Sequence, residues 1–399
     1  MDGVVDLPLE PDRERKAHVL LAASELYVAR GYHDAGEARI FEELFRQLLP
    51  ETPASQRLAI ARLLAAYEHP PEGCLETLAA DSDEAVAAAA LAGPAPLCEA
   101  ALIAAVGRGP ERVRAAVAAR PDLAAPVRLA LARHAAPSTL KRLLAMAPSG
   151  PDDDVLDVLF TRPEVIGELA VPLARRHVLP ASLLFALFLD LDEAGRMEAL
   201  AAAETRALAD FARRGDPRVL HASFKPDVLK HLVDAALSGG AAAFAAHLAY
   251  TLDLDGETAA RIVEDRGGEA LMVALRALGT SDTESGRIAV RLLGQRLPLD
   301  RLRALLALHD RITPHATHHL IRGLSAGLEA ALREAREAAS VRAVAGEALP
   351  LAAGGEGQHH MPLFSGQARG EARASDPRGT DAQRQPAARP LPRRDRDAG

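Results

Sequence analysis

The chain contains no tryptophan, and aromatic residues make up only 3% of its 399 residues. Hydrophobic residues nevertheless account for 49% of the sequence, with alanine and leucine the commonest among them. Strong helix formers with few β-branched side chains argue against a sheet-based core and predict an all-α protein. The length is sufficient for two folded units or for one array of small elements.

Cysteine is also scarce. Cys74 and Cys98 are separated by 24 positions and form no CxxC motif, so the sequence does not support a zinc site and suits a reducing cytoplasm. Acidic residues stand in MDGVVDLPLEPDRERK (1–16), where a signal peptide would carry positive charge. The most apolar stretch, 235–252, is interrupted by Gly239 and Gly240 and is a poor membrane span. We therefore expect a cytoplasmic protein with no membrane contact.

Recognised motifs for catalysis and nucleotide binding are missing as well. GRGPER (107–112) and GGEGQ (354–358) fall short of GxGxxG and of GxxxxGK[ST], and neither follows a predicted strand. GLSAG (323–327) matches GxSxG but follows no predicted strand, and the chain has no HExxH and no Cys/His arrangement. Its net charge of −8 argues against a dedicated nucleic-acid-binding protein. These observations favour a protein that is not an enzyme, needs no cofactor and has no evident small-molecule substrate.

An internal repeat of about 27 residues runs through the first half of the chain. Four sets of residues recur at this spacing: Pro110 and Pro137; Pro94, Pro121 and Pro148; Val86, Val113 and Leu140; Leu75, Leu102 and Leu129. Agreement of four sets on one period is hard to obtain by chance, even in an alanine-rich chain.

Each repeat is predicted to contain two short helices. The first carries Leu102, and the second begins near Pro110 and stops before Pro121, since proline is tolerated in the first helical turn and disfavours helix in the residue before it. Val113 and Val117 form a narrow apolar stripe that cannot stabilise an isolated helix of about ten residues. Neighbouring units must therefore stack and share a core, as in α-solenoids.

The repeat becomes irregular after residue 150. We place a degenerate unit at 152–177 and predict a bundle of longer helices beyond it, with Asp192 and Thr313 as N-caps and Gly267–Gly268 as a helix terminator. The last residues are rich in Gly, Pro, Arg and Asp and nearly lack apolar clusters, which predicts disorder. The predicted divisions are a flexible N-terminus at 1–11, a repeat half at 12–178, a helical second half at 179–342 and a disordered tail at 343–399.

Two stretches share a longer pattern with known proteins. They are LAADSDEAVAAAALAGPAPLCEAALI (78–103), which VRAAVAARPDL (113–123) follows, and LAYTLDLDGETAARIVEDRGGEALMVALRALG (248–279). Over roughly residues 40–310 the chain resembles the uncharacterised family called domain of unknown function 2336, which is typical of alphaproteobacteria and described as HEAT-like helical repeats. The resemblance implies a helical-repeat scaffold and carries over no catalytic residue. The matching positions are consistent with caps and turns: Asp81, Pro121, Asp265, Gly268 and Glu269.

Basic residues are concentrated in one part of the repeat. Between 108 and 142, eight basic residues face only Glu111 and Asp122, whereas 151–210 holds twelve acidic and five basic residues. In a stacked array such a charge separation can steer an acidic protein partner onto the first half. A merely solvated face is the alternative, and nucleic acid is unlikely to be the partner because 108–142 contains no aromatic residue for base stacking. The residues that we expect to contact a partner are Arg112, Arg114, Arg128 and Arg133.

The segment TPHATHHLIRGLSAGL (313–328) carries the clearest chemical signal. On a helix, His315 and His319 lie about 160° from the centre of the apolar stripe, so we expect both to be exposed. That stripe consists of Leu320, Ile321, Leu324, Leu328, Leu332 and Ala335. A helical histidine pair can bind a divalent metal, but the sequence places no third ligand. A solvated helical face is the plainest interpretation.

A third interpretation concerns phosphoryl transfer. HLIRGLS (319–325) resembles the phosphoacceptor segment of histidine phosphotransfer domains, although it has arginine where lysine is usual and Leu324 where a small residue is usual. The resemblance implies that the neutral imidazole of His319 attacks an acyl phosphate, that Arg322 offsets charge and that Gly323 leaves room for a docking receiver.

The sequence as a whole favours a cytoplasmic, non-enzymatic scaffold of HEAT-like repeats that binds other proteins. The alternative is a phosphorelay protein with an exposed His319 as its transient phosphoacceptor.

Overall fold

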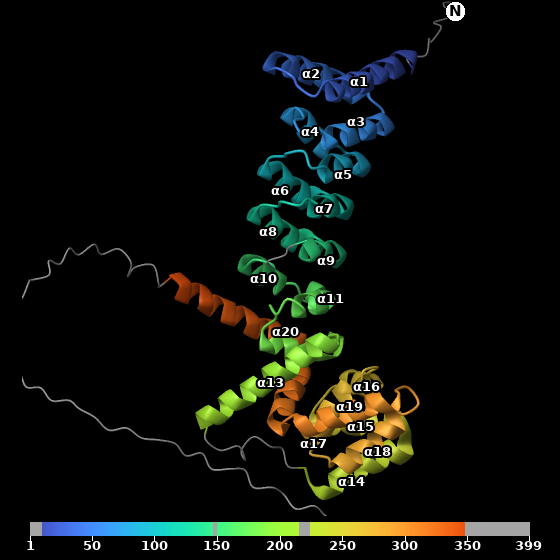
Figure 1. Cartoon of the computed structure of the whole chain (residues 1–399), viewed down its shortest axis with the longest axis vertical. Helices are drawn as coiled ribbons and strands as arrows, with labels where there is room; N and C mark the ends of the chain where they lie inside the picture. Colours follow the sequence, from blue (N-terminus) through green and yellow to red (C-terminus); the bar gives the residue numbers. More distant parts are fainter. Residues whose placement is uncertain (1–9, 147–149, 215–223, 348–399) are drawn as a thin grey trace, which may run out of the picture. The chain divides into compact units, whose positions relative to one another are not determined.

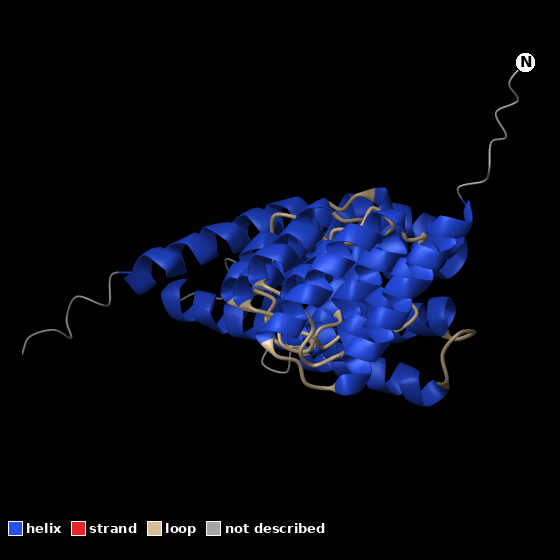
Figure 2. Cartoon of the chain, turned by 90° about the horizontal axis from the view of Figure 1, so that it is seen from above, coloured by secondary structure: helices blue, strands red, loops and turns tan. Residues whose placement is uncertain are grey.

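The computed structural model describes residues 10–146, 150–214 and 224–347. Within these ranges the chain forms α-helices, short 3₁₀ turns and one π turn, and no strand (Figure 2). The predicted all-α class is therefore confirmed. Its source is the abundance of alanine and leucine, which cost little side-chain entropy in a helix.

The first part of the chain consists of short helices joined by brief turns. It begins with α1 (Glu10–Arg30), α2 (Ala35–Leu48), η1 (Leu49–Glu51) and α3 (Ala54–Ala66). Pairs of helices follow: α4 (Glu72–Ala79) and α5 (Glu84–Ala92); α6 (Glu99–Arg108) and α7 (Glu111–Ala118); α8 (Ala125–His134) and α9 (Pro137–Met146); α10 (Asp153–Leu159) and α11 (Pro163–Ala174). The second helices begin at residues 84, 111, 137 and 163, at intervals of 27, 26 and 26 residues, which matches the predicted spacing.

Proline delimits these helices as expected, with one shift of position. Helix α7 lies between Pro110 and Pro121, but Pro110 is its N-cap in an extended conformation, not its first helical residue. Pro137 does begin α9. Val113 and Val117 are 3% and 0% exposed, so the predicted stripe of α7 belongs to the core.

Successive pairs pack in two adjacent rows of helices, which can be followed in Figure 1. Helices α3, α5, α7, α9 and α11 contact one another in that order, and α4, α6, α8 and α10 form the second row. Equivalent residues of neighbouring units, such as Val86, Val113 and Leu140, are buried in the shared core. Each short helix is therefore stabilised by the units before and after it, because its own apolar face is too narrow.

Arginine side chains join the units at helix ends. Arg120, after α7, donates to three carbonyl oxygens that follow or end α5, at 2.6–3.0 Å. Arg162 donates in the same way to two carbonyl groups at the end of α8, at 2.7 and 3.0 Å, and Arg176 donates to a carbonyl of α9. The last carbonyl groups of a helix have no partner within it, so these guanidinium groups satisfy acceptors that would otherwise be unpaired.

The second part of the chain contains two long helices among shorter ones. Among the described helices after residue 178, only α13 and α20 exceed 13 residues, so the predicted lengthening is confined to these two. Helix α20 bends at Gly327, which has φ of 75° and divides it into two helical segments. The elements are α12 (Ala181–Ala186), η2 (Phe188–Asp190), α13 (Glu193–Arg214), α14 (Pro226–Asp234), η4 (Ala235–Gly239), α15 (Gly240–Leu252), α16 (Gly256–Glu264), α17 (Glu269–Leu278), α18 (Asp282–Leu293), α19 (Leu299–Arg311) and α20 (Pro314–Glu347).

The predicted caps and terminator of this part are confirmed. Asp192 accepts a hydrogen bond from the main-chain N–H of Gly195 at 3.0 Å, at the start of α13. The Thr313 hydroxyl accepts one from Ala316 at 3.3 Å, at the start of α20. Gly268 separates α16 from α17 with φ of +84°, a conformation that glycine adopts readily.

Two predicted boundaries differ from the structure. Helix occupies residues 10–11 and 343–347, where a flexible N-terminus and a tail were expected. The remaining parts of those segments, 1–9 and 348–399, lie outside the described residues. The division between 178 and 179 stays a prediction.

One described segment, Pro226–Leu252, is long and apolar enough to cross a membrane by length and composition, and 33% of its most apolar window is buried. It consists of α14, η4 and α15, and Gly240 interrupts it with φ of 80° and ψ of −175°. The interruption that the sequence predicts at Gly239–Gly240 is therefore present. A core helix of a soluble protein passes the same test of length and composition.

Candidate functional site

The arginines predicted to contact a partner divide into two groups. Arg114 and Arg128 belong to the fold: Arg114 donates to a carbonyl of α6 at 2.9 Å, and Arg128 forms an ion pair with Asp152 at 2.7 Å. Lys141 pairs in the same way with Glu168 at 3.1 Å. The acidic segment after residue 150 therefore neutralises part of the basic segment within the chain itself, and Arg114 and Arg128 are not free to bind a partner.

Arg112 and Arg133 are exposed, and neither is paired with another residue that the structure describes. Their surroundings differ. Arg112 of α7, Arg62 of α3 and Arg142 of α9 line a groove of about 510 Å³, which we call the basic groove. Arg133 does not line it, so the structure places only one of the four predicted arginines at this surface.

The floor of the basic groove is made largely of alanine. Neither a carboxylate nor an aromatic side chain lines it. Methyl groups allow another backbone to approach closely, and the three guanidinium groups give the groove a positive charge that no lining residue offsets. The alanines, from α3, α5, α7 and the residue that follows α7, are Ala65, Ala66, Ala85, Ala88, Ala89, Ala92, Ala115, Ala116 and Ala119.

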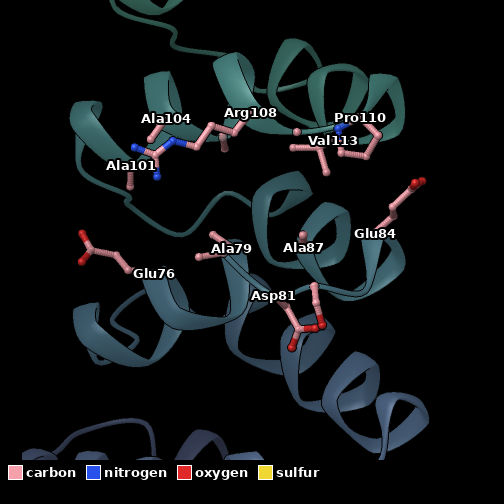
Figure 3. Close-up of a pocket in the computed structure, with 14 residues that line it drawn as sticks. Glu76, Ala79, Asp81, Glu84, Ala87, Ala101, Ala104, Arg108, Pro110 and Val113 are labelled. Carbon is pink, nitrogen blue, oxygen red and sulfur yellow. The ribbon is translucent and has the colours of Figure 1, made fainter.

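A second cavity, of about 320 Å³, lies between the pairs α4/α5 and α6/α7 (Figure 3). Arg108 of α6 lies on one side of it and Glu76 of α4 on the other, with alanine methyl groups between them. Ala104 lines the cavity, and the residue 27 positions later is Leu131, which is fully buried. The cavity is therefore a consequence of small side chains at one repeat position.

His319 lies in a polar pocket of about 410 Å³ between α12, α13 and α20. Its side chain is only 12% exposed, and its Nε2 atom is 3.4 Å from a carboxylate oxygen of Asp210. The prediction that His319 is exposed is therefore wrong, and His315, one turn earlier, is half-buried. Arg322 is exposed and lines the same pocket, so the structure does bring His319 and Arg322 together.

Helix packing around Gly323 explains why His319 is covered. A Cβ atom at Gly323 would lie 2.3 Å from the Cβ of Phe185, so α12 already fills the room that was expected to accommodate a receiver. Gly323, Ala326 and Ala330 follow His319 at helical spacing and line the pocket beside it. This row of small residues allows α12 and α13 to approach α20 closely, and it is the sequence signal that indicates burial of this face.

The other charged groups of this pocket come from α13 and from α20. Arg206 pairs with Glu334 at 3.2 Å, and Arg213 pairs with Asp210 at 3.0 Å. Burial lowers the pKa of His319, and this effect outweighs the attraction of Asp210. The positive charges of Arg206 and Arg322 lower that pKa further, so the imidazole is neutral at pH 7. Sequence analysis missed Arg206, Asp210 and Arg213, which lie more than a hundred positions before His319.

A buried ionic cluster joins α13, α17 and α19. Arg196 is 9% exposed by side chain and contacts Asp265 and Glu269 at 2.8 Å each, and Glu269 also binds Arg301. Asp265 accepts a further hydrogen bond from the main-chain N–H of Gly268 at 2.9 Å. Burial alone would lower the pKa of Arg196, but its two carboxylate partners outweigh burial and raise it. The cluster explains the matching positions Asp265, Gly268 and Glu269 as parts of one structural joint.

The family model described as "Uncharacterised protein conserved in bacteria (DUF2336)" matches residues 86–322. The chain belongs to this family. The match begins at residue 86, not near residue 40 as expected, and it extends beyond residue 310 to include His319 and Arg322. Neither the curated proteins nor the solved structures contain a match to the chain.

Helices α18 and α19 of this DUF2336 chain hold a Ser–His–Asp arrangement that sequence analysis missed, in which Ser285 and His309 are buried and the Asp282 side chain is 70% exposed. His309 Nε2 is 3.0 Å from the Ser285 hydroxyl, and His309 Nδ1 is 3.2 Å from an oxygen of Asp282. Ser285 and His309 are both 0% exposed, and the Ser285 hydroxyl also contacts Thr280 at 2.8 Å. A nucleophile must reach its substrate, so the arrangement acts as a polar link in the core, not as a catalytic triad.

Stability of this DUF2336 chain is expected to depend on pH through His309. Burial and the charge of Arg276 lower the pKa of His309 below its ordinary value of 6.5, and they outweigh Asp282 and Asp310. The folded protein therefore holds His309 neutral, whereas the unfolded chain binds a proton below about pH 6.5. The free energy of unfolding should accordingly fall as the pH drops below about 6.5, by up to about 1.4 kcal/mol for each pH unit. Urea unfolding between pH 7 and pH 5 tests this expectation. The fall in the free energy of unfolding with pH should be shallower in His309→Gln and the same as in the wild type in the control His134→Gln. Equal slopes in the wild type and both variants would disprove the expectation.

Metal ligands are not gathered anywhere in the described ranges of this DUF2336 chain: no group of three or more His, Cys, Asp or Glu side chains is placed to hold an ion. Its cysteines are unpaired thiols, with Cys74 buried and Cys98 exposed. Burial raises the pKa of Cys74 to about 12, which keeps it protonated and unreactive at neutral pH.

Proposed function

We propose that this DUF2336 chain is a non-enzymatic scaffold that binds an acidic segment of another protein in the basic groove. The observation that carries the proposal is the alanine floor across α3, α5 and α7 with Arg62, Arg112 and Arg142 around it. We further propose that the stacked pairs form an α-solenoid of HEAT-like units and that the protein works in the cytoplasm, as its unpaired thiols favour.

An acidic protein segment suits the groove better than nucleic acid does. Proteins that bind single strands combine positive charge with aromatic side chains on which bases stack, and the groove is lined by no aromatic residue. The alanine floor instead favours close contact with a helix or an extended backbone, and carboxylates of the partner can pair with the guanidinium groups at the edges.

The phosphorelay alternative stays a prediction. A neutral imidazole next to Arg322 supports it, since a neutral imidazole is the nucleophilic form. However, Nε2 of His319 faces Asp210, and α12 packs against Gly323 where a receiver would have to approach. The basic groove has no such obstruction and is the better-supported site.

Charge reversal in the groove tests the scaffold proposal. We expect the full chain to bind a labelled helical peptide rich in Glu and Ala, measured by fluorescence anisotropy. Replacing Arg62, Arg112 and Arg142 with Glu should raise the dissociation constant at least about tenfold, because three attractive contacts become repulsive. All three arginines are exposed, and none makes a hydrogen bond or ion pair to another described residue, so the substitutions break no polar contact of the fold.

The matched control reverses Arg39, Arg133 and Arg287, which are exposed and lie outside the groove. It changes the net charge equally, so a specific groove predicts a change of less than about threefold. Equal losses of peptide affinity in both triple variants would mean that the overall charge of the protein, and not the groove, determines binding. A duplex oligonucleotide should bind more weakly than the peptide. If it binds more tightly, and the groove variant abolishes its binding, then the partner is a nucleic acid and not a protein.

A further inference from the structure

The pocket around His319 contains more hydrogen-bond donors than its own carboxylates use. A guanidinium group offers five N–H donors. Arg206 gives one nitrogen, Nη1, to Glu334, and Arg213 gives Nη2 to Asp210 and Nε to a carbonyl of its own helix. Arg322 lines the pocket and has no hydrogen bond or ion pair to any residue that the structure describes. Several donors from two helices therefore remain available in one concave site.

The charge of the pocket is positive. Three guanidinium groups face two carboxylates there, and the imidazole of His319 is neutral but can donate a hydrogen bond. Asp210 pairs with Arg213 at 3.0 Å and Glu334 with Arg206 at 3.2 Å, which reduces the conformational freedom that these arginines would lose on binding a ligand. Arg322 belongs to α20 and the other two arginines belong to α13, so the donors come from two helices.

We propose that this pocket binds the phosphate group of a phosphomonoester. A phosphate group carries about two negative charges at pH 7 and several oxygen acceptors in a tetrahedral arrangement, and guanidinium groups match it by paired hydrogen bonds. A single carboxylate is planar and carries one charge, so it would satisfy fewer of the donors. A volume of about 410 Å³ accommodates a phosphate with a small organic group attached. The site is separate from the basic groove, and the proposal does not rest on the scaffold function.

The same chemistry can come from a free phosphorylated metabolite or from a phosphorylated side chain of a protein. Isothermal titration calorimetry on the full chain with inorganic phosphate, phenyl phosphate, phosphoserine within a short peptide, and acetate distinguishes these sources. We expect saturable binding of one phosphate compound per chain and at least about tenfold weaker binding of acetate. Preference for phenyl phosphate over the peptide indicates a metabolite, and the reverse order indicates a modified protein.

Arg322→Gln is the decisive variant, because Arg322 is exposed and its replacement breaks no hydrogen bond or ion pair between described residues. We expect it to weaken phosphate binding at least about tenfold. Arg206→Gln, which keeps a polar side chain but lacks the charge, should have a similar effect, whereas the control Arg303→Gln on α19 should change binding less than about twofold.

Binding that is not saturable, or that Arg322→Gln leaves unchanged, would overturn the proposal. Mass spectrometry after incubation with acetyl phosphate tests for a covalent phosphoryl group on His319. Its detection would overturn the binding proposal in favour of the phosphorelay alternative.

Discussion

Replacing Arg196 with alanine is expected to lower the free energy of unfolding by about 3–5 kcal/mol, because two buried carboxylates lose their shared cation. Asp265 and Glu269, its partners at 2.8 Å, are 7% and 5% exposed by side chain. Removing Arg196 leaves these carboxylates buried with too little positive charge, since Arg301 forms an ion pair with Glu269 and acts on Asp265 only at longer range. Arg196 also lies over the ring of Phe188, with 5.7 Å between Cζ and the ring centroid, so packing is lost as well.

Urea unfolding followed by circular dichroism measures the change, and hydrogen exchange at α13 and α17 shows where stability is lost. The matched control is Arg261→Ala, which removes an ion pair with Asp190 whose side chains are 45% and 40% exposed and should cost less than about 1 kcal/mol. A double variant, Arg196→Met with Glu269→Gln, removes opposite charges together and should recover part of the loss. If Arg196→Ala costs no more than the control, the cluster is not a structural joint.

The repeat could be predicted because its determinants are local. Pro110, Pro121 and Pro137 constrain the backbone wherever they occur, and a period of about 27 residues is visible without knowledge of tertiary contacts. The same holds for Asp192, Thr313 and Gly268, whose effects act within a few residues of their own positions. Features of this kind depend on short stretches of sequence, and the structure confirms them.

Contacts between distant segments could not be predicted in this way. Arg128 meets Asp152 and Lys141 meets Glu168, so the charges that suggested a partner are partly consumed within the chain. Counting charges shows how many are present but not which ones pair. Arg196 lies 69 positions before Asp265, and no periodic pattern connects the two.

The burial of His319 shows the same limit for a single helix. The apolar stripe identifies the face of α20 that packs on the core, and Leu320 and Leu332 are indeed 0% and 1% exposed. A helical wheel then assigns the opposite face to solvent, although α12 and α13 cover part of it. Gly323 was interpreted as room for a partner, and the structure shows that Phe185 fills that room. Small residues permit close packing, but they do not say which neighbour packs.

Arg120→Ala is expected to lower the free energy of unfolding by about 2–3 kcal/mol, less than the loss of Arg196. Its guanidinium group donates to the carbonyl oxygens of Leu91, Gly93 and Ala95 at 2.6–3.0 Å, and burial lowers its pKa. Without it these acceptors at the end of α5 lose a charged donor in a partly buried position. Hydrogen bonds to charged groups contribute more than neutral ones, which sets the size of the effect.

Comparison with lysine separates geometry from charge. Arg120→Lys keeps the positive charge, but one ammonium group cannot match the planar fork that bonds three carbonyls, so we expect it to recover less than half of the loss. Arg133→Ala on α8 is the control, because Arg133 is exposed and has no partner among the described residues; it should cost less than about 0.5 kcal/mol. Urea unfolding of the three variants tests this order, and full recovery by lysine would mean that charge near the end of α5, not the bonded geometry, holds the units together. Arg162 donates to two carbonyl groups at the end of α8 and Arg176 to one of α9, so we expect the same order of variants at those two junctions, with smaller losses.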